Sequence, residues 1–476
     1  MKAIHFLSVI LISCSTLFAQ KNVDQILTEL DGQSQNFSNI AHTIWNYAEL
    51  GYQEVKSSAL LQSTLEKEGF KVEAGVAGIP TAFIAEYGSG EPVIAFLSEY
   101  DALPGLSQEI TTEKKSAGGN AGHGCGHHLL GTAATAAAIS VKNWLSSYKF
   151  KGTIRLYGCP AEEGGSGKVY MSRAGLFDDV DCVLDWHPSN KNNANPKVRL
   201  ANKSAKFRFY GFSAHASSNP DKGRSALDAV ESMNFMVNMM REHIPQESRI
   251  HYVITDGGKA PNVVPDYAEV YYYCRHPRRD VVRDIFDRIA KAAEGAALGT
   301  STTTDYEIIG GTHEMLHNYT LQELLYKNLE KVGGFSYTPE EREFAEAITK
   351  TLNKEHLNVA YVEGVMPYDT ALNFNGAGSS DVGDVSFNAP TGTFQAASFV
   401  PETPGHSWQV VATGGTSIGP KGMMVAAKTL TTTAIDLFSN PNIIQAAKDE
   451  FHKARGENFK YEPLLGDRAP ALDYRN

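Results

Sequence analysis

A glycine-rich segment in the first third of the chain gathers side chains that bind metal ions. It offers one thiol and three imidazoles in the run Gly122-His123-Gly124-Cys125-Gly126-His127-His128. Thiolate and imidazole are good ligands for zinc and its neighbours. An Ala-rich, helix-like stretch, Leu129–Leu145, follows directly, and a helix N-terminus lowers the pKa of a nearby thiol. Taken alone, the segment is explained equally well as a polar loop that caps this helix.

Two adjacent carboxylates follow a predicted strand. Glu162 and Glu163 lie in the turn Pro160–Gly165, after the strand-like run Lys151–Cys159. Catalytic groups in open α/β sheets gather at the carboxyl ends of strands. Neighbouring side chains that leave a strand point to different sides, so one carboxylate can bind a metal while the other transfers protons. A solvated acidic turn is the alternative interpretation.

Further polar groups occupy similar positions. His187 closes the strand-like run Val180–His187, and Glu99 and Asp101 follow the run Pro92–Ser98. His406 lies in a loop far downstream, in Pro404-Gly405-His406-Ser407-Trp408. A lone histidine of this kind is more often a hydrogen-bonded structural residue than a ligand. The two carboxylates would serve equally well as capping residues.

The elements that must position these groups alternate between helix and strand. Apolar residues recur at helical spacing between Val23 and about Phe70, which predicts two amphipathic helices. Strand-like runs then alternate with helix-like ones as far as His187. We therefore expect a mostly parallel sheet with both faces covered, in an α/β catalytic domain.

The order of elements changes in the middle of the chain. Between about Lys203 and Ile309 it becomes strand, helix, two strands, helix and strand, which is the β-α-β-β-α-β pattern of a ferredoxin-like α+β unit. Elements of the first style resume afterwards, so the unit is predicted to be an insertion. We expect a signal peptide (1–20), the first part of the catalytic domain (21–202), the inserted unit (203–312), and the second part with a tail (313–476).

Composition and targeting signals narrow the class of protein. The 476 residues carry a formal net charge of −11, without a basic stripe, which excludes nucleic acid as the expected partner. Lys2, an apolar run and Ala19-Gln20 form a signal-peptide pattern that is too short for a transmembrane anchor, so we expect export to the periplasm or beyond. Lipid anchoring at Cys14 is the alternative. We expect the other cysteines to form no disulfide framework.

Several of these segments, taken together, match one family. The chain resembles the M20 metallopeptidases and amidohydrolases, in particular the branch of aminobenzoyl-glutamate hydrolases and aminoacylases. The resemblance spans almost the whole mature chain and rests on the segments Glu99–Gly105, Gly122–His127, Pro160–Gly165, Trp186-His187-Pro188, Gly211–Ala216, Asn262–Pro265 and Ser380–Ser386.

The resemblance implies roles for individual residues. Two divalent metal ions would be bound by Cys125, His127, Glu163, His187 and His406. Zinc is favoured by the thiolate, with manganese or cobalt as alternatives. Glu162 would be the general base. The inserted unit would act as a lid and a homodimerisation domain, with His215 stabilising the oxyanion in the partner's site and with Asn262 and Arg275 binding substrate.

Two departures from the family pattern limit this transfer. His128 stands where relatives commonly carry an acidic residue or an amide, and Glu99-Tyr100-Asp101 replaces a His-x-Asp motif. Glu99 and Asp101 are therefore assigned to the surroundings of the metal site and not to the ligands. The predicted function is hydrolysis of an amide in a small N-acyl amino acid, an aminobenzoyl-glutamate-like compound or a dipeptide. The alternatives are a catalytically silent binding module and a subunit that needs a related partner chain.

Overall fold

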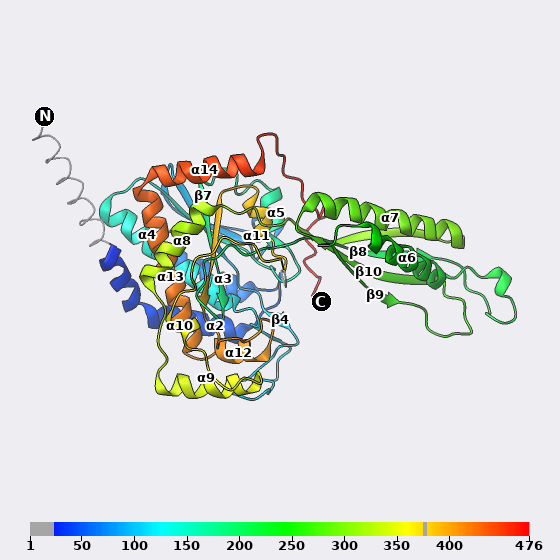
Figure 1. The fold of residues 1–476 in the computed structure, drawn as a ribbon, viewed down its shortest axis with the longest axis horizontal. Coiled ribbons are helices and arrows are strands. Elements are labelled where there is room, and N and C mark those ends of the chain that lie inside the picture. Colours follow the sequence, from blue (N-terminus) through cyan, green and yellow to red (C-terminus); the bar gives the residue numbers. More distant parts are fainter. Residues whose placement is uncertain (1–22, 375–377, 476) are drawn as a thin grey trace, which may run out of the picture.

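The computed structural model describes residues 23–374 and 378–475 and divides them into a main domain and a projecting arm (Figure 1). The main domain contains a six-stranded sheet in the order β1-β2-β6-β3-β7-β12. Its strands are β1 (Lys71–Ala74), β2 (Phe83–Ser89), β3 (Val93–Ser98), β6 (Gly152–Gly158), β7 (Cys182–Ser189) and β12 (Thr391–Ala397). Strands β6, β3, β7 and β12 are mutually parallel, whereas β1 and β2 run antiparallel at one edge. The predicted mostly parallel sheet is confirmed.

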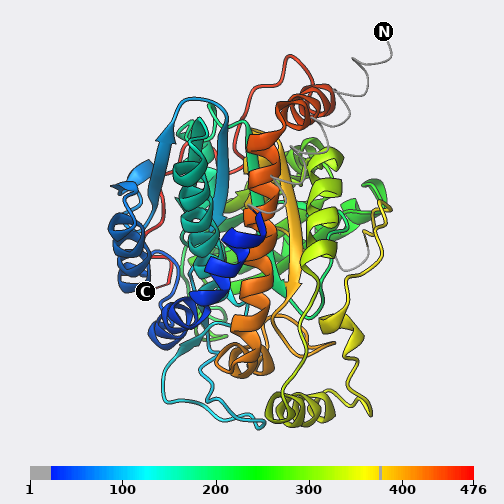
Figure 2. The same cartoon turned by 90° about the vertical axis from the view of Figure 1, so that its left-hand side faces the viewer.

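Side chains of the sheet alternate between two hydrophobic cores. In β3, Ile94 and Phe96 enter one core, and Ala95 and Leu97 enter the other. The larger core lies under helices that cross one face of the sheet (Figure 2). These are α2 (Ser34–Tyr47), α3 (Val55–Lys67), α4 (His127–Tyr148), α8 (Tyr319–Val332), α13 (Ile418–Ser439) and α14 (Pro441–Arg455), and residues 23–32 are helical as well. The opposite face is covered by α5 (Gly167–Arg173) and α11 (Val382–Ser386).

The arm is the predicted ferredoxin-like insertion, called the lid below. Its elements follow in the order β8 (Ala201–Tyr210), α6 (Ala226–Met240), β9 (Arg249–Asp256), β10 (Tyr267–His276), α7 (Arg279–Thr300) and β11 (Thr303–Thr312). The strands form an antiparallel sheet in the order β11-β8-β10-β9. Helices α6 and α7 pack on one face of this sheet and form a separate hydrophobic core.

Some elements have no counterpart in the sequence-based prediction. The short edge strand β1 and the two-residue pair β4 (Leu103–Pro104) and β5 (Ala121–Gly122) are too short to give a periodic signal. The helices α9 (Pro339–Thr351), α10 (Ala360–Glu363) and α12 (Trp408–Gly414) complete the second part of the main domain. The predicted signal peptide and Cys14 lie outside the described residues. None of the helices in 23–374 or 378–475 combines the length and apolarity needed to cross a bilayer.

The segment that follows α14, residues 456–475, runs between the two domains and is called the tail below (Figure 1). Leu464 is buried in the core of the lid, and its neighbour Leu465 is buried in a core of the main domain. Arg173 of α5 holds the tail by donating hydrogen bonds to the carbonyls of Gly466 and Arg468 at 2.8 and 2.9 Å. The tail therefore has a defined path at the domain junction.

The contact between α4 and β3 generates the first prediction. A Cβ at Gly131 of α4 would lie 2.5 Å from the Glu99 carbonyl oxygen, which is backbone and cannot swing aside. We expect Gly131→Ala to force the helix from the strand and to lower the free energy of unfolding by about 1–3 kcal/mol, as overpacking does. Chemical denaturation measures this change.

Gly295 of α7 provides the matched control, because its added Cβ would have its nearest neighbour, Met236, at 3.9 Å. Gly295→Ala should stabilise the protein by roughly 0.5–1 kcal/mol, the ordinary gain from replacing a helical glycine. A Gly131→Ala protein that gains stability to the same extent would contradict the close approach of α4 and β3.

Candidate metal centre

The predicted ligands converge where the parallel strands end. Cys125 and His127 stand at the N-terminus of α4, where Gly126 adopts a left-handed φ of 80° that lets the chain turn sharply into the helix. Glu163 follows β6, His187 is near the end of β7, and His406 comes from the loop before α12. Functional side chains at the carboxyl edge of a parallel sheet are expected for an open α/β fold.

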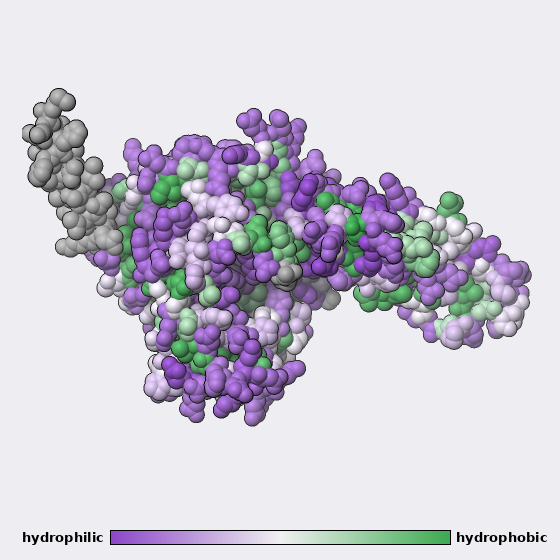
Figure 3. All heavy atoms as spheres, in the orientation of Figure 1, coloured by the Kyte–Doolittle hydropathy of each residue, from purple (hydrophilic) through white to green (hydrophobic). Residues whose placement is uncertain are grey.

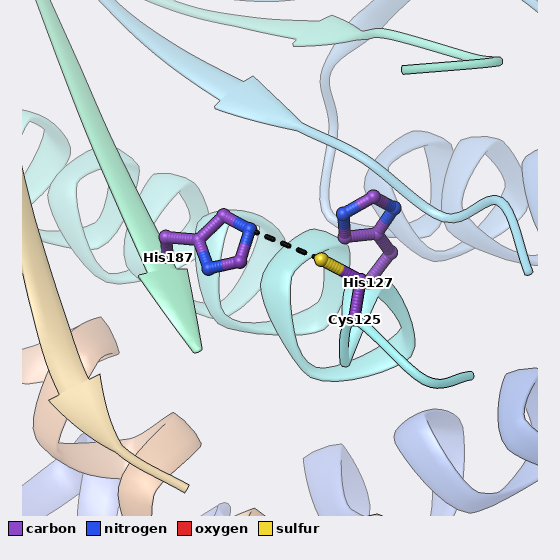
Figure 4. A group of neighbouring side chains, drawn as sticks. All are labelled: Cys125, His127 and His187. Carbon is purple, nitrogen blue, oxygen red and sulfur yellow. Dashed lines mark hydrogen bonds between the residues drawn. The ribbon is translucent and has the colours of Figure 1, made fainter. Parts of the chain in front are cut away.

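Cys125, His127 and His187 form a first group of possible ligands (Figure 4). Their ligand atoms lie within 4.8 Å of one another, and Cys125 Sγ is 3.4 Å from His187 Nε2. His187 Nδ1 lies 2.7 Å from the Pro188 carbonyl oxygen, and His127 Nδ1 lies 2.7 Å from Asp101 Oδ1. Each contact fits a ring whose Nδ1–H donates outward, which leaves Nε2 with a lone pair for an ion.

Cys125, Glu163 and His406 form a second group with the same spacing. His406 Nε2 lies 2.9 Å from Glu163 Oε1, and the His406 backbone N–H donates to the Gly124 carbonyl at 2.9 Å. Cys125 and then Glu163 raise the pKa of His406 to about 10, because both place negative charge beside the imidazole. Since Cys125 belongs to both groups, its sulfur is placed to bridge two ions.

The donor set fits divalent cations. Glu99 Oε2, His127 Nε2 and Glu163 Oε1 are buried without a hydrogen-bond partner. Glu99 Oε2 and His127 Nε2 are only 3.1 Å apart, yet neither makes a hydrogen bond. Buried polar atoms left in this way are costly unless something else satisfies them. A cation bound between these atoms would satisfy all three.

Protonation states in the site follow from burial and from neighbouring charges. Burial, followed by the nearby His127, lowers the pKa of His187 well below its usual range, which keeps its imidazole in the neutral form that binds metals. Burial would also lower the pKa of His127, but Cys125, Asp101 and Glu99 outweigh it and raise that pKa. Burial, then Glu99 and Glu163, raises the pKa of Glu162 well above its ordinary value.

A buried lysine is the main feature that sequence reasoning missed. The Lys168 side chain has no exposed surface, and its Nζ lies 2.5 Å from Glu99 Oε1 and 2.8 Å from Asp381 Oδ1. A buried ammonium of this kind needs such partners, because removal from water would otherwise be prohibitive. The available signal was one lysine in the otherwise uncharged start of α5, together with Asp381 in a motif to which no role was given.

The structure separates other predicted residues from these groups. His215 and Asn262 are exposed neighbours on the lid, where the Ala216 N–H donates to the Asn262 carbonyl at 3.0 Å. They do not line the pocket beside Glu162, whereas Arg275 does. His123 and His128 pack against each other with ring centroids 4.8 Å apart, and their Nε2 atoms contact backbone carbonyls.

Known proteins share this sequence over most of its length. Residues 201–300 match the family model described as the peptidase dimerisation domain of M20 proteins. The chain is 43% identical over 468 residues to a p-aminobenzoyl-glutamate hydrolase chain of Escherichia coli (strain K12), covering 93% of this chain and 97% of that protein. It is 29% identical to the Xaa-Arg dipeptidase of Mus musculus, over 89% of this chain and 90% of the relative.

Solved structures share the fold at lower identity. An aminobenzoyl-glutamate utilization protein from Klebsiella pneumoniae superposes with a TM-score of 0.60 at 18% identity, covering 87% of this chain and 98% of that one. A dinuclear metal-binding peptidase of the M20 family from Bacillus subtilis gives a TM-score of 0.58 at 16% identity, covering 86% and 99%. Both similarities extend over the main domain and the lid together.

Proposed function

Since the chain belongs to the M20 family of hydrolases, we propose that it hydrolyses the amide bond of a small N-acylated amino acid, an aminobenzoyl-glutamate-like compound or a dipeptide. The observation that carries the proposal is the pair of three-residue ligand groups that share Cys125 beside Glu162. Two divalent ions would be held there, one by Cys125, His127 and His187 and one by Cys125, Glu163 and His406. The thiolate and the imidazoles favour zinc, with manganese or cobalt as alternatives.

Names of relatives support this substrate class. One is a chain of p-aminobenzoyl-glutamate hydrolase, others are Xaa-Arg dipeptidases, and another is a hippurate hydrolase. When bound, the two ions would make a water acidic enough to attack near neutral pH and would offset charge on the scissile carbonyl oxygen. A panel of acyl amino acids, aminobenzoyl-glutamate and dipeptides, tested with metal-reconstituted protein, checks the proposal. No hydrolysis of any of them would refute it.

The chain's own groups would perform the proton transfers. Glu162 lies in the pocket beside the ligand groups, next to Glu163. Its carboxylate would accept the proton of the attacking water and then deliver that proton to the departing amine nitrogen. Asp101, which contacts His127 Nδ1 and accepts a hydrogen bond from the Glu163 N–H at 2.9 Å, holds two of the proposed ligands in position.

This division of roles generates the second prediction. Glu162→Gln should retain metal and lose about 10²- to 10⁴-fold in kcat, the usual contribution of a general base. Glu163→Ala should lose bound metal, because it removes one carboxylate ligand. Metal analysis of each purified variant, alongside turnover, separates the two effects. Equal metal loss in both variants would rule out separate roles.

We also propose a homodimer formed through the lid. Strand β9 is an edge of the lid sheet, and Tyr252, Val253 and Ile254 on it are 37%, 56% and 39% exposed. Phe235 and Met239 of α6 are 65% and 60% exposed, and Figure 3 shows apolar surface along the arm. An open edge strand flanked by exposed apolar side chains is suited to pairing with another chain. Two lids joined at β9 would form one continuous sheet.

The third prediction concerns His215, which is exposed on the lid and does not line the pocket of its own chain. We propose that it stabilises the developing oxyanion in the partner's site, with Asn262 beside it binding substrate. His215→Ala and Glu162→Gln should each be inactive, since an oxyanion donor contributes about 10²- to 10³-fold in kcat. Mixing the two variants and allowing protomers to exchange should restore part of the activity.

Demonstrated exchange of protomers without recovery of activity would argue that His215 acts within its own chain. The same preparations test the alternative of a subunit that requires a related chain. An active, pure homodimer excludes this alternative, whereas activity that appears only with a co-purified relative supports it.

We further propose that the protein is exported, on the basis of the signal-peptide pattern before Gln20. Sequencing of the mature N-terminus distinguishes cleavage after Ala19 from processing and lipid attachment at Cys14. An intact N-terminus on cell-associated protein would contradict export.

A further inference from the structure

The pocket beside Glu162 is built from both domains and from the tail. It has a volume of about 380 Å³, and its walls include Glu162, Glu163 and His406 on the main-domain side. The lid contributes Arg275, and the tail contributes Arg475. Two guanidinium groups from distant parts of the chain therefore face the same space as the proposed metal ligands.

Neither guanidinium has an acidic partner among the described residues. Arg275 lies over the ring of Tyr273, 5.4 Å from its centroid, and Arg475 lies over the ring of Tyr474 at 4.7 Å. Arg475 Nη2 donates to the Glu163 carbonyl at 2.5 Å, whereas its Nε is buried without a hydrogen-bond partner. Elsewhere, buried or half-buried arginines are neutralised by carboxylates, as Arg279 is by Glu314 at 2.7 Å.

The position of Arg475 is fixed by its neighbours. The Tyr474 hydroxyl donates to the Glu163 carbonyl at 3.0 Å, and its ring meets that of Tyr52 edge-on at 5.5 Å. Tyr52 in turn donates to the Gly165 carbonyl at 2.6 Å. The end of the tail is thus attached to the turn that carries Glu162 and Glu163. A guanidinium held in this way loses little freedom when it binds an anion, which is the condition for selective recognition.

Carboxylate is the anion that suits this site. A guanidinium presents parallel N–H donors that match the two oxygens of a carboxylate. The proposed function already brings one carboxylate, that of the amino acid released by hydrolysis. One arginine is sufficient for that group, and the second cation remains without a counter-charge.

Resting on the proposed function, we propose that Arg475 is a specificity-determining residue that binds a second carboxylate of the substrate. Arg275 binds the α-carboxylate of the amino acid half, and Arg475 binds an acidic side chain. The pocket thereby selects N-acyl derivatives of acidic amino acids, of the acyl-aspartate or acyl-glutamate class. The tail is a part of the substrate site.

The test compares matched substrates with the metal-loaded enzyme. N-benzoyl-glutamate and N-benzoyl-glutamine have the same shape and differ in one charge. Wild type should prefer the glutamate compound, and Arg475→Gln should lower kcat/KM for it by roughly 10- to 100-fold, the effect of losing a charged hydrogen bond. For the glutamine compound the same variant should change kcat/KM little, and Arg475→Lys should recover part of the preference.

Arg278→Gln is the matched control, because Arg278 is an exposed lid arginine outside the pocket that pairs with Asp280. It should leave both substrates unaffected. If Arg475→Gln impairs both substrates equally, Arg475 only supports the structure, and the inference fails. It fails as well if wild type does not distinguish the two compounds.

Calorimetric binding of free L-glutamate and L-glutamine to the metal-loaded protein separates this inference from the proposed reaction. Binding of glutamate that exceeds that of glutamine and disappears in Arg475→Gln supports the inference even if no amide is cleaved. No preference for glutamate in the wild-type protein overturns it.

Discussion

The site is governed by the repulsion between carboxylates that the fold brings together at one edge of the sheet. Glu99, Glu162, Asp185 and Asp381 all come from segments that end or begin at that edge. Burial, together with the charge of Glu99, raises the pKa of each of the other three. Lys168 offsets part of this charge from a fully buried position. What it leaves unbalanced lies on the side of His127 and Glu163, where buried atoms have no hydrogen-bond partner. An internal ammonium and bound cations therefore complement each other in the proposed site.

Backbone conformation at this edge departs from what the residue types favour. Ala161, before the two glutamates, and His406 have φ values of 57°, in a region that side chains with a Cβ seldom adopt. Such conformations persist only where surrounding contacts impose them. Ala161 is held by a hydrogen bond from its N–H to buried Glu54, and His406 by its bond to the Gly124 carbonyl. Both departures occur in loops that present proposed ligands, which is where local preference is expected to yield to function.

Much of this arrangement could be predicted from sequence, for identifiable reasons. The lid has an uninterrupted alternation of strands and helices, and the proposed ligands are chemically distinctive residues at strand ends. By contrast, the pairing of Lys168 with Glu99 and Asp381 joins residues far apart in the chain, and a lysine alone gives no signal of burial. His123 and His128 looked like ligands because composition does not show which way a side chain faces. Arg475 has no motif, and only the path of the tail brings it to the pocket.

That path has a mechanical consequence. Leu464 and Leu465 are adjacent residues, yet they are buried in the cores of different domains. Consecutive Cα atoms lie only about 3.8 Å apart, so the junction cannot open there unless one of the two leucines leaves its core. Further along the chain, the same segment ends at Glu163 through Tyr474 and Arg475. A swing of the lid would thus pull on the floor of the pocket, and the tail acts as a drawstring between domain angle and the shape of the site.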